Sequence, residues 1–382
     1  MKCSSCGGTL RYDVDRYGLA CDFCGSFRPL HRPEEGVVVG EMDFASAIRG
    51  ADTNWGVTRR LVICKSCGAQ MLYDSDQMSG MCPFCGSAIV LSAEDANCGI
   101  APNAIIPFSI PKEQVIERFY RWNKFAFWSP ERFRKGKVLG NITPLYIPYW
   151  TFDADVVVTY SGKFGYTTGS DENRRTSWYL KTGIFEKHID DYCVCGSRKF
   201  ANDTLLNSVV SFKPRDLHAY SPEILSGMPA EIYTVGIDEA WVNARNGGMN
   251  KSIIDAVKAH ESADSCSELR FSTEYYNVKY RYVLVPVWLS GCKYGGKIYN
   301  VAASGHNGSA HCTRPVSIAK LITFLVLFLT CAVLSKIFDV AAWFVMFGVM
   351  AFFAFAIIYA VAFFVTLNEQ RTKERMRREG TG

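Results

Sequence analysis

The chain of 382 residues lacks the signatures of several large enzyme families. It contains no G-x-S-x-G, no H-E-x-x-H and no G-x-G-x-x-G that opens a helix, which argues against the enzymes built on those motifs. Residues 291–297 do fit the phosphate-loop spacing G-x4-G-K. However, Ile298 occupies the Ser/Thr position and the residues after it alternate like a strand, so residues 294–297 are expected to form a hairpin turn.

A basic excess is also missing from most of the chain. The formal net charge is +5, but residues 316–382 contribute +3 of it, and residues 1–95 hold nine Lys/Arg against twelve Asp/Glu. Nucleic-acid binding depends largely on the neutralisation of phosphates by Lys and Arg. Residues 1–95 carry −3, or −7 with two divalent ions on eight thiolates, which disfavours nucleic acid as a partner.

Cysteine, in contrast, is abundant and regularly spaced. Eight of the fifteen cysteines form two sets of the pattern C-x2-C-x14-C-x2-C, with a constant offset of 61 residues between the sets. A glycine after the second cysteine of each pair permits the tight turn that directs both thiolates onto one ion. The predicted ligands are Cys3, Cys6, Cys21 and Cys24 in the first set and Cys64, Cys67, Cys82 and Cys85 in the second.

This spacing predicts two closed structural zinc sites, in ribbon 1 (residues 1–29) and ribbon 2 (residues 63–91). Ribbons this small bury little apolar surface, so metal binding is expected to supply much of their folding energy. Disulfides would need an oxidising compartment, and no apolar signal segment precedes Cys3. Iron in a rubredoxin-like site is the weaker alternative, because four thiolates also suit iron.

The long hydrophobic runs that the rest of the chain lacks lie near its C-terminus. Residues 340–365 contain no charged side chain, and residues 318–338 form a second run if Lys320 and Lys336 extend toward lipid headgroups. At 1.5 Å per residue the shorter run reaches about 31 Å, enough for a bilayer core of about 30 Å. We therefore predict a two-helix transmembrane hairpin over residues 318–366.

The cations around the hairpin predict its orientation. Five Lys/Arg lie in the tail, residues 367–382, whereas the connection between the two spans offers Lys336. The positive-inside rule then places both ends of the hairpin in the cytoplasm, where thiols stay reduced. The expected location is the bacterial cytoplasmic membrane, with the N-terminal domains and the basic tail cytoplasmic and the tail against anionic lipid.

Between the second ribbon and the hairpin, residues 104–315 are long enough for one α+β domain. Helices are expected within the linker (residues 30–62) at residues 41–51, after Pro111, and over residues 238–260 with a break at Gly247-Gly248. Apolar and alternating runs predict strands at residues 104–110, 145–152, 156–160, 163–168, 178–185 and 275–289.

The central region offers few side chains for chemistry. Asp153 and Asp155 lie two residues apart on an expected strand and could form a carboxylate pair, although capping or backbone bonding is the simpler role. Cys193 and Cys195 look like half a metal site, but no second pair follows, so we expect them on a strand. If the chain is an enzyme, Asp153, Asp155 and His188 are the first residues to test.

Several central segments resemble a bacterial family of zinc-ribbon membrane proteins, often labelled as transcription-factor-IIB-type zinc ribbons. The resemblance implies partners similar to phage-shock protein A or to flotillins, which such proteins anchor at the membrane during envelope stress. It implies the eight cysteine ligands and supplies no catalytic residue. The segments are residues 104–112 (AIIPFSIPK), 146–155 (YIPYWTFDAD), 221–231 (SPEILSGMPAE), 238–241 (DEAW), 285–289 (VPVWL) and 293–297 (KYGGK).

The sequence thus predicts a multidomain protein: two small four-cysteine zinc ribbons, an α+β central domain and a C-terminal two-helix transmembrane hairpin. Its expected function is that of a non-enzymatic adaptor that binds two structural Zn²⁺ ions and recruits or scaffolds cytoplasmic proteins at the bacterial inner membrane. A membrane-tethered nucleic-acid-binding regulator and a membrane-bound enzyme with its site in the central domain are the two alternatives.

Overall fold

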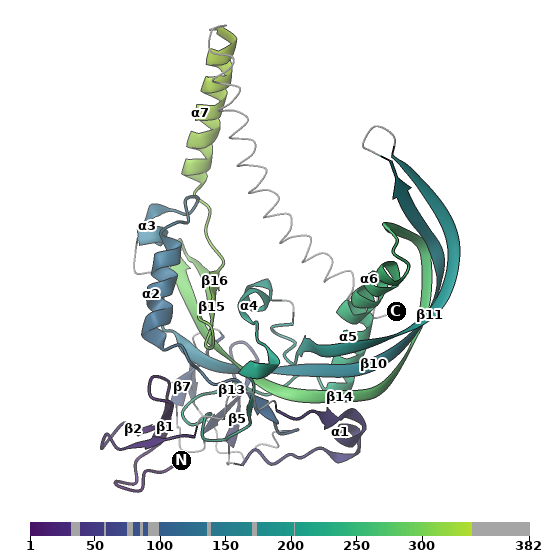
Figure 1. The fold of residues 1–382 in the computed structure, drawn as a ribbon. Helices are drawn as coiled ribbons and strands as arrows, with labels where there is room; N and C mark the ends of the chain where they lie inside the picture. The colour runs from purple at the N-terminus through teal and green to yellow at the C-terminus, as the bar shows by residue number, and fades with distance from the viewer. Residues whose placement is uncertain are drawn as a thin grey trace.

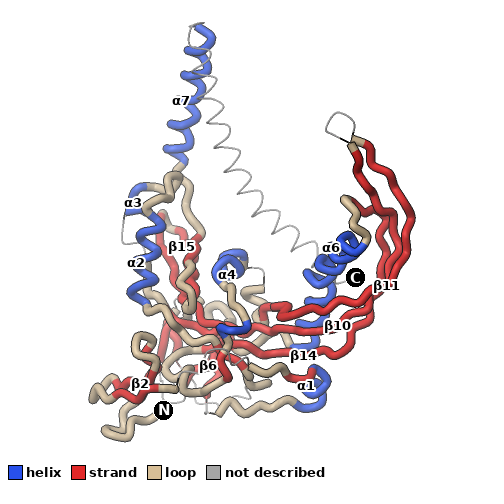
Figure 2. Tube along the Cα trace, in the orientation of Figure 1, coloured by secondary structure: helices blue, strands red, loops and turns tan. Residues whose placement is uncertain are grey.

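The computed structural model describes residues 1–31, 39–56, 59–74, 79–84, 87–90, 99–135, 139–169, 174–201 and 203–337. In this part of the chain β-strands dominate, and the helices are few and short (Figure 1; Figure 2). The α+β balance expected for the central domain is therefore corrected to a mainly β architecture.

The strands are β1 (Leu10–Asp13), β2 (Gly18–Cys21), β3 (Phe27–Pro29), β4 (Met42–Asp43), β5 (Arg59–Ile63), β6 (Gln70–Asp74), β7 (Ser79–Met81), β8 (Ala88–Val90), β9 (Ala104–Ile105), β10 (Thr143–Thr168), β11 (Arg175–Cys195), β12 (His218–Ala219), β13 (Ala230–Glu231), β14 (Ser265–Tyr294), β15 (Lys297–Ser304) and β16 (Ala310–Cys312). The helices are α1 (Phe44–Gly50), α2 (Lys112–Asn123), α3 (Glu131–Lys135), α4 (Thr204–Val209), η1 (Pro214–Asp216), α5 (Ile237–Ala244), η2 (Arg245–Met249), α6 (Asn250–His260) and α7 (Ile318–Ile337).

Three long antiparallel strands form the frame of the fold, with β10 between β14 and β11. β10 has 26 residues, β11 has 21 and β14 has 30, so the three strands expected between residues 145 and 168 are one continuous strand. Figure 1 shows the outer parts of these strands curving away from the ribbons, and we call this part the wing. Register shifts between Asp153 and Asp155 mark bulges, which bend a strand and increase its twist.

Helices α5 and α6 lie inside the curve of the wing (Figure 1). The predicted helical segment and its break are confirmed, because the π-helical η2 joins the two helices and Gly247 has non-helical φ/ψ of −96° and −120°. Trp241 of α5 packs on Phe152 of β10, with ring centroids 5.3 Å apart. Beyond α6, the Glu261 carboxylate accepts a 2.7 Å hydrogen bond from Lys181 of β11. These contacts hold both helices against the sheet.

Several shorter elements follow their sequence predictions. α1 lies within residues 41–51, and α2 begins after Pro111 with Phe119 buried. β14 turns into β15 through Gly295 and Gly296, whose φ angles of 56° and 76° belong to the left-handed region that a tight hairpin turn requires. The predicted hairpin is therefore confirmed in place of a phosphate loop.

The two cysteine-rich ribbons attach to the frame in different ways. In ribbon 1, β1, β2 and β3 form a small sheet of their own. In ribbon 2, β6 pairs with β13 through Leu72 opposite Ala230 and Met71 opposite Glu231, and β13 in turn pairs with β10. β5 and β6 therefore belong to the large sheet, which connects eleven of the described strands.

A short loop, residues 225–228, contacts both ribbons, and we call it the bridging loop. On one side, the carbonyl of Ser226 accepts a 2.9 Å hydrogen bond from the N–H of Tyr12 in β1. On the other side, the N–H of Gly227 donates a 2.6 Å hydrogen bond to the carboxylate of Asp74 at the end of β6. Two adjacent residues of one loop thus fix the positions of both ribbons.

Arg59 completes this arrangement from the start of β5. Its guanidinium group is buried and donates hydrogen bonds to the carbonyls of Leu225, at 3.0 Å, and Met228, at 3.4 Å. It also forms an ion pair with Asp74, with 3.1 Å between the charged atoms. Because each end of the bridging loop is bonded to the same side chain, the loop is held in one conformation.

The predicted transmembrane hairpin is wrong in the part that the structure describes. Among the described residues, no helix is long and apolar enough to cross a membrane. The second expected span, residues 340–365, lies outside the described residues. The two-span location in the bacterial cytoplasmic membrane is corrected on the same finding.

The physical reason lies at the start of α7. The first expected span required Lys320 to extend toward lipid headgroups, but its ammonium group donates hydrogen bonds of 2.8 and 2.9 Å to the carbonyls of Phe127 and Ser129. The first turn of α7 is thus fastened to the connection between α2 and α3. The uncharged run after it, residues 321–335, reaches only about 22 Å, short of a bilayer core of about 30 Å.

We predict that Gly227→Ala destabilises the protein. The φ of Gly227 is +77°, and an added Cβ would lie 2.7 Å from Cγ of Arg11. The substitution should lower the free energy of unfolding by about 1–3 kcal/mol. Gly236→Ala is the matched control, because nothing lies within 4 Å of an added Cβ there and its φ is −63°. Thermal melts check this, and equal melting temperatures of the two variants would contradict it.

Candidate metal centres

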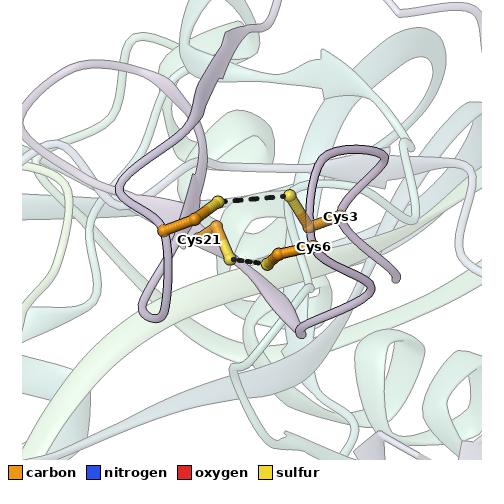
Figure 3. Close-up of side chains that lie close together, drawn as sticks. Cys3, Cys6 and Cys21 are labelled. Carbon is orange, nitrogen blue, oxygen red and sulfur yellow. Dashed lines mark hydrogen bonds between the residues drawn. The ribbon is translucent and has the colours of Figure 1, made fainter.

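The four cysteines of ribbon 1 converge on one point, and Figure 3 labels three of them, Cys3, Cys6 and Cys21. The Sγ atoms of Cys3 and Cys24 are 3.7 Å apart, and those of Cys6 and Cys21 are 3.5 Å apart. All four sulfur atoms lie within 4.8 Å of one another. Cys3 and Cys6 come before β1, whereas Cys21 is the last residue of β2 and Cys24 follows it. The β1–β2 hairpin therefore brings the two C-x2-C pairs together. Four free thiols placed in this way could hold a metal ion.

The distances fit metal thiolates and do not fit disulfides. A disulfide joins its sulfur atoms at about 2.0 Å. A tetrahedral ion with four sulfur ligands at about 2.3 Å keeps those ligands about 3.8 Å from one another. Gly7 and Gly25, which follow the second cysteine of each pair, both have φ of 73°, and Gly68 has φ of 70°. A side chain at these positions would strain the turn that aims the sulfur atoms.

Ribbon 2 repeats this arrangement. The sulfur atoms of Cys64, Cys67 and Cys82 lie within 4.8 Å of one another, with 3.6 Å between those of Cys67 and Cys82. Cys85, the fourth predicted ligand, lies outside the described residues. The structure therefore gathers the other seven predicted ligands into two clusters that could hold metal ions.

Two serines at equivalent positions of the repeat support the thiolates. The hydroxyl oxygen of Ser26 lies 3.0 Å from Sγ of Cys3 and 3.2 Å from that of Cys24, and the hydroxyl of Ser87 lies 3.3 Å from Sγ of Cys64. The Ser26 hydroxyl and nearby N–H groups lower the pKa of Cys3 to about 6. Burial opposes the same change in Cys64, but the Ser87 hydroxyl and backbone N–H groups lower its pKa to about 6. In Cys6 the N–H of Gly8 acts in the same direction, but the neighbouring thiols of Cys24 and Cys21 raise the pKa to about 12, so Cys3 and Cys64 are the thiols that ionise most readily.

The two centres differ in what covers them. Over ribbon 2, the ammonium group of Lys199 donates a 3.3 Å hydrogen bond to Sγ of Cys67 and lies 4.1 Å from the ring centroid of Phe84. The ring of Phe84 also stacks on Phe200, with centroids 4.9 Å apart. In ribbon 1, Phe23 occupies the position equivalent to Phe84 and is 78% exposed.

The carboxylates selected from the sequence point to different partners. Asp155 is 2.7 Å from Nδ1 of His188 and accepts a 2.9 Å hydrogen bond from Asn277. Hydrogen bonds from Asn277 and His188 lower the pKa of Asp155, and the bond with Asp155 raises that of His188. His188 is exposed, so this pair ties neighbouring strands of the wing together at its surface.

Asp153 belongs to a buried charge cluster that the sequence did not reveal. Its carboxylate lies within 4.8 Å of those of Asp190 and Asp191. Arg281 of β14, itself buried, forms ion pairs with Asp191 at 2.5 Å, with Asp153 at 3.5 Å and with Glu41 at 3.0 Å. Burial raises the pKa of Asp153 to about 7. The guanidinium group of Arg281 supplies the positive charge that balances these carboxylates. Its ion pairs join the linker to β10, β11 and β14.

A cavity of about 540 Å³ lies where ribbon 1 meets the central region. Its lining includes His218, whose Nδ1 is 3.2 Å from the hydroxyl of Tyr17, and His306, whose Nε2 is 3.6 Å from Asp216. Burial lowers the pKa of His218. The two histidines are 88 positions apart in the sequence, so no local pattern could have predicted their proximity.

Comparison with known proteins shows one similarity that spans most of the chain. The chain is 25% identical over 330 residues to YdjG, an uncharacterized protein of Bacillus subtilis (strain 168), and the alignment covers 84% of this chain and 91% of the relative. No protein-family model matches the chain, and no solved structure does. The likeness to YdjG therefore extends well beyond the two cysteine-rich ribbons.

We predict that single ligand substitutions each remove one metal ion. Cys24→Ser should reduce the bound metal from two ions per chain to one, and Cys82→Ser should do the same through ribbon 2, because each ribbon needs its complete ligand set. Cys193→Ser, on β11, is the control and should keep both ions. Metal content of the purified variants, measured by mass spectrometry, checks this. An unchanged metal content of Cys24→Ser would remove ribbon 1 from the metal sites.

A buried acid lies beneath ribbon 2. Glu231 of β13 is 2% exposed and accepts a 2.6 Å hydrogen bond from the hydroxyl of Ser197. Burial raises the pKa of Glu231 to about 8. The folded protein therefore holds this proton at neutral pH, where an unfolded chain has lost it.

The raised pKa of Glu231 predicts a stability that depends on pH. Below its ordinary value of 4.5 both states are protonated, and the stability contribution is complete; it is lost as the pH rises toward about 8. Glu231→Gln keeps the acceptor for Ser197 but cannot ionise. At pH 8.5 the substitution should raise the free energy of unfolding by up to about a few kcal/mol, and the melting temperature with it. At pH 4.5 it should change both little. Calorimetry at both pH values checks this, and an equal shift at the two would contradict it.

Proposed function

We propose that the chain is a non-enzymatic adaptor in which each ribbon holds one structural zinc ion and ribbon 1 docks protein partners. Four thiolates that close around an ion leave no position for a reacting water, which is typical of structural zinc. The convergence of Cys3, Cys6, Cys21 and Cys24, and of Cys64, Cys67 and Cys82, supports a resident metal in both ribbons. Metal analysis separates zinc from iron, the other ion that four thiolates suit.

The exposure of ribbon 1 is the observation that carries the docking role. Phe23, between two of the metal ligands, is 78% exposed. The ribbon itself is held on the frame by Tyr12 and by the ion pair between Arg28 and Glu223. An exposed aromatic ring on a rigid support is the type of anchor that is enriched at protein interfaces. This combination supports protein binding in preference to metal chemistry.

The polar groups of the central region support a structural role as well. Arg281 pairs with Asp153 and Asp191, and the pair of Asp155 and His188 lies at the surface of the wing. Each of the residues first considered for an enzyme thus has a partner that stabilises the fold. The acidic balance of residues 1–95, nine Lys/Arg against twelve Asp/Glu, favours protein over nucleic acid as the partner.

The family resemblance suggests which partners to test first. These are proteins similar to phage-shock protein A and to flotillins, in the bacterial response to envelope stress. In this proposal the adaptor gathers such partners on one rigid support, with ribbon 1 as a docking surface.

The proposal predicts that partner binding depends on the ribbons. Tagged wild-type chain, Cys24→Ser and Cys82→Ser would be purified from bacterial cells, and the bound proteins would be identified by mass spectrometry. At least one partner of the wild type should be lost from Cys24→Ser, because ribbon 1 unfolds without its metal. Cys193→Ser should retain every partner. Retention of all partners by both ribbon variants would exclude the ribbons as docking surfaces.

A further inference from the structure

Ribbon 2 provides an internal example of a segment that docks on a cysteine turn. We call the surface formed by Cys67 and Phe84 the knuckle of ribbon 2. The segment is Lys-Phe-Ala at residues 199–201. Its lysine donates to Sγ of Cys67 and lies over the ring of Phe84, and its phenylalanine, Phe200, stacks on the same ring at 4.9 Å and 23°. Phe200 is 6% exposed and also belongs to the apolar core of the central region, so the segment joins that core to ribbon 2. Docking thus combines a charge-assisted bond to a metal-binding thiolate, a cation–π contact and an aromatic stack.

Ribbon 1 presents the same knuckle uncovered. At the offset of 61 residues, Cys6 corresponds to Cys67 and Phe23 to Phe84. Cys6 is exposed, and Phe23 is 78% exposed. Asp22 stands beside Phe23, where ribbon 2 has a proline, but it forms a 3.1 Å ion pair with Arg11, so the negative charge of this surface comes from the thiolates. This knuckle therefore suits a segment that carries a lysine next to an aromatic ring.

The chain contains the docking tripeptide a second time. Residues 124–126, in the turn after α2, are also Lys-Phe-Ala. The N–H of Phe125 donates to the carbonyl three residues earlier at 3.3 Å, as the N–H of Phe200 does at 3.2 Å, so the two copies have this turn bond in common. Lys124 is exposed, and Phe125, at 83%, is the most exposed large hydrophobic side chain among the described residues.

The surroundings of the two surfaces have complementary charge. Residues 117–135, around the exposed tripeptide, contain six Lys/Arg and two Asp/Glu. The knuckle of ribbon 1 carries the net negative charge of four thiolates around one divalent ion. Within one chain the surfaces lie apart, because ribbon 1 is at the end of the molecule near β2 and the turn after α2 is beside α3 and α7 (Figure 1). Residues 124–126 therefore reach ribbon 1 only from another copy of the chain.

We propose that Lys124 and Phe125 of one copy of this chain dock on Cys6 and Phe23 of a second copy, as Lys199 and Phe200 dock on ribbon 2. This proposal rests on the adaptor function, since it requires a ribbon 1 that metal has folded. The two surfaces differ, so the contact is head to tail: the copy that supplies its tripeptide keeps a free knuckle, and the other copy keeps a free tripeptide. Such contacts extend into rings or open chains. The adaptor would then present its partners in an array.

Pairwise capture with two variants tests this proposal. Phe23→Ala removes the knuckle surface and Phe125→Ala removes the tripeptide surface; both side chains are exposed, so folding is retained. Full-length chains with two different affinity tags are mixed in each combination. Capture of Phe23→Ala by itself, and of Phe125→Ala by itself, should fall at least tenfold below the wild type. Phe23→Ala should still capture Phe125→Ala, because that combination retains one complete interface.

Sedimentation velocity gives an independent measure. The wild type should form species larger than dimers as its concentration rises, whereas the mixture of Phe23→Ala and Phe125→Ala should stop at the dimer. Lys124→Glu should weaken assembly, and wild-type assembly should weaken with salt. Leu180→Ala, 73% exposed on β11, is the matched control and should assemble like the wild type.

Two outcomes would overturn the proposal. One is equal capture in every combination, which is the result expected if the chains associate through α7. The other is the absence of capture between Phe23→Ala and Phe125→Ala. These outcomes are distinct from failure of the adaptor function. If Cys24→Ser loses its protein partners while all tag combinations behave alike, the adaptor function stands and self-docking fails. If complementary capture succeeds while the cysteine variants keep all partners, self-docking stands and the partners bind elsewhere.

Discussion

The pairing of β10 with β14 is the constraint on which the rest of the structure depends. It runs from Thr143 opposite Leu289 to Gly165 opposite Ser265, so one continuous ladder reaches from the ribbons to the tip of the wing. β11 extends the ladder on one side, and β13 connects it to ribbon 2. The bulges near Asp153 bend the three strands together, and this curvature makes room for α5 and α6. The elements that carry function are thus positioned relative to one rigid frame.

The ribbons combine local and long-range control. The cysteine turns and the short hairpin account for the shape of each ribbon, but the bridging loop determines how the ribbon faces the rest of the protein. Ser226 and Gly227 bind opposite ribbons, and buried Arg59 holds the loop between them. The result is asymmetric: one knuckle is covered by Lys199 and Phe200, and the other presents Phe23 to solvent. This asymmetry is the basis of the proposed docking role.

Features that depend on a few neighbouring residues were predictable from the sequence. The turn at Gly295 and Gly296 and the helix break at Gly247 follow from backbone geometry that glycine permits. The continuity of β10 was not predictable, because Asp153 and Asp155 interrupt its apolar pattern, and their partners come from β11 and β14. The apolar run of α7 was misread for a similar reason. Composition alone does not show that Lys320 binds two backbone carbonyls of a distant segment.

By itself the sequence determined which cysteines form the clusters that could hold metal, because two-residue spacings and the glycines after them act within a single turn. It also determined that the same knuckle occurs twice. Only the tertiary structure decided which knuckle is covered, where His188 and Asp153 find their partners, and that Arg281 neutralises a buried acidic group. These depend on contacts between residues tens to hundreds of positions apart. Such contacts are set by the register of long strands and by burial, which no local pattern encodes.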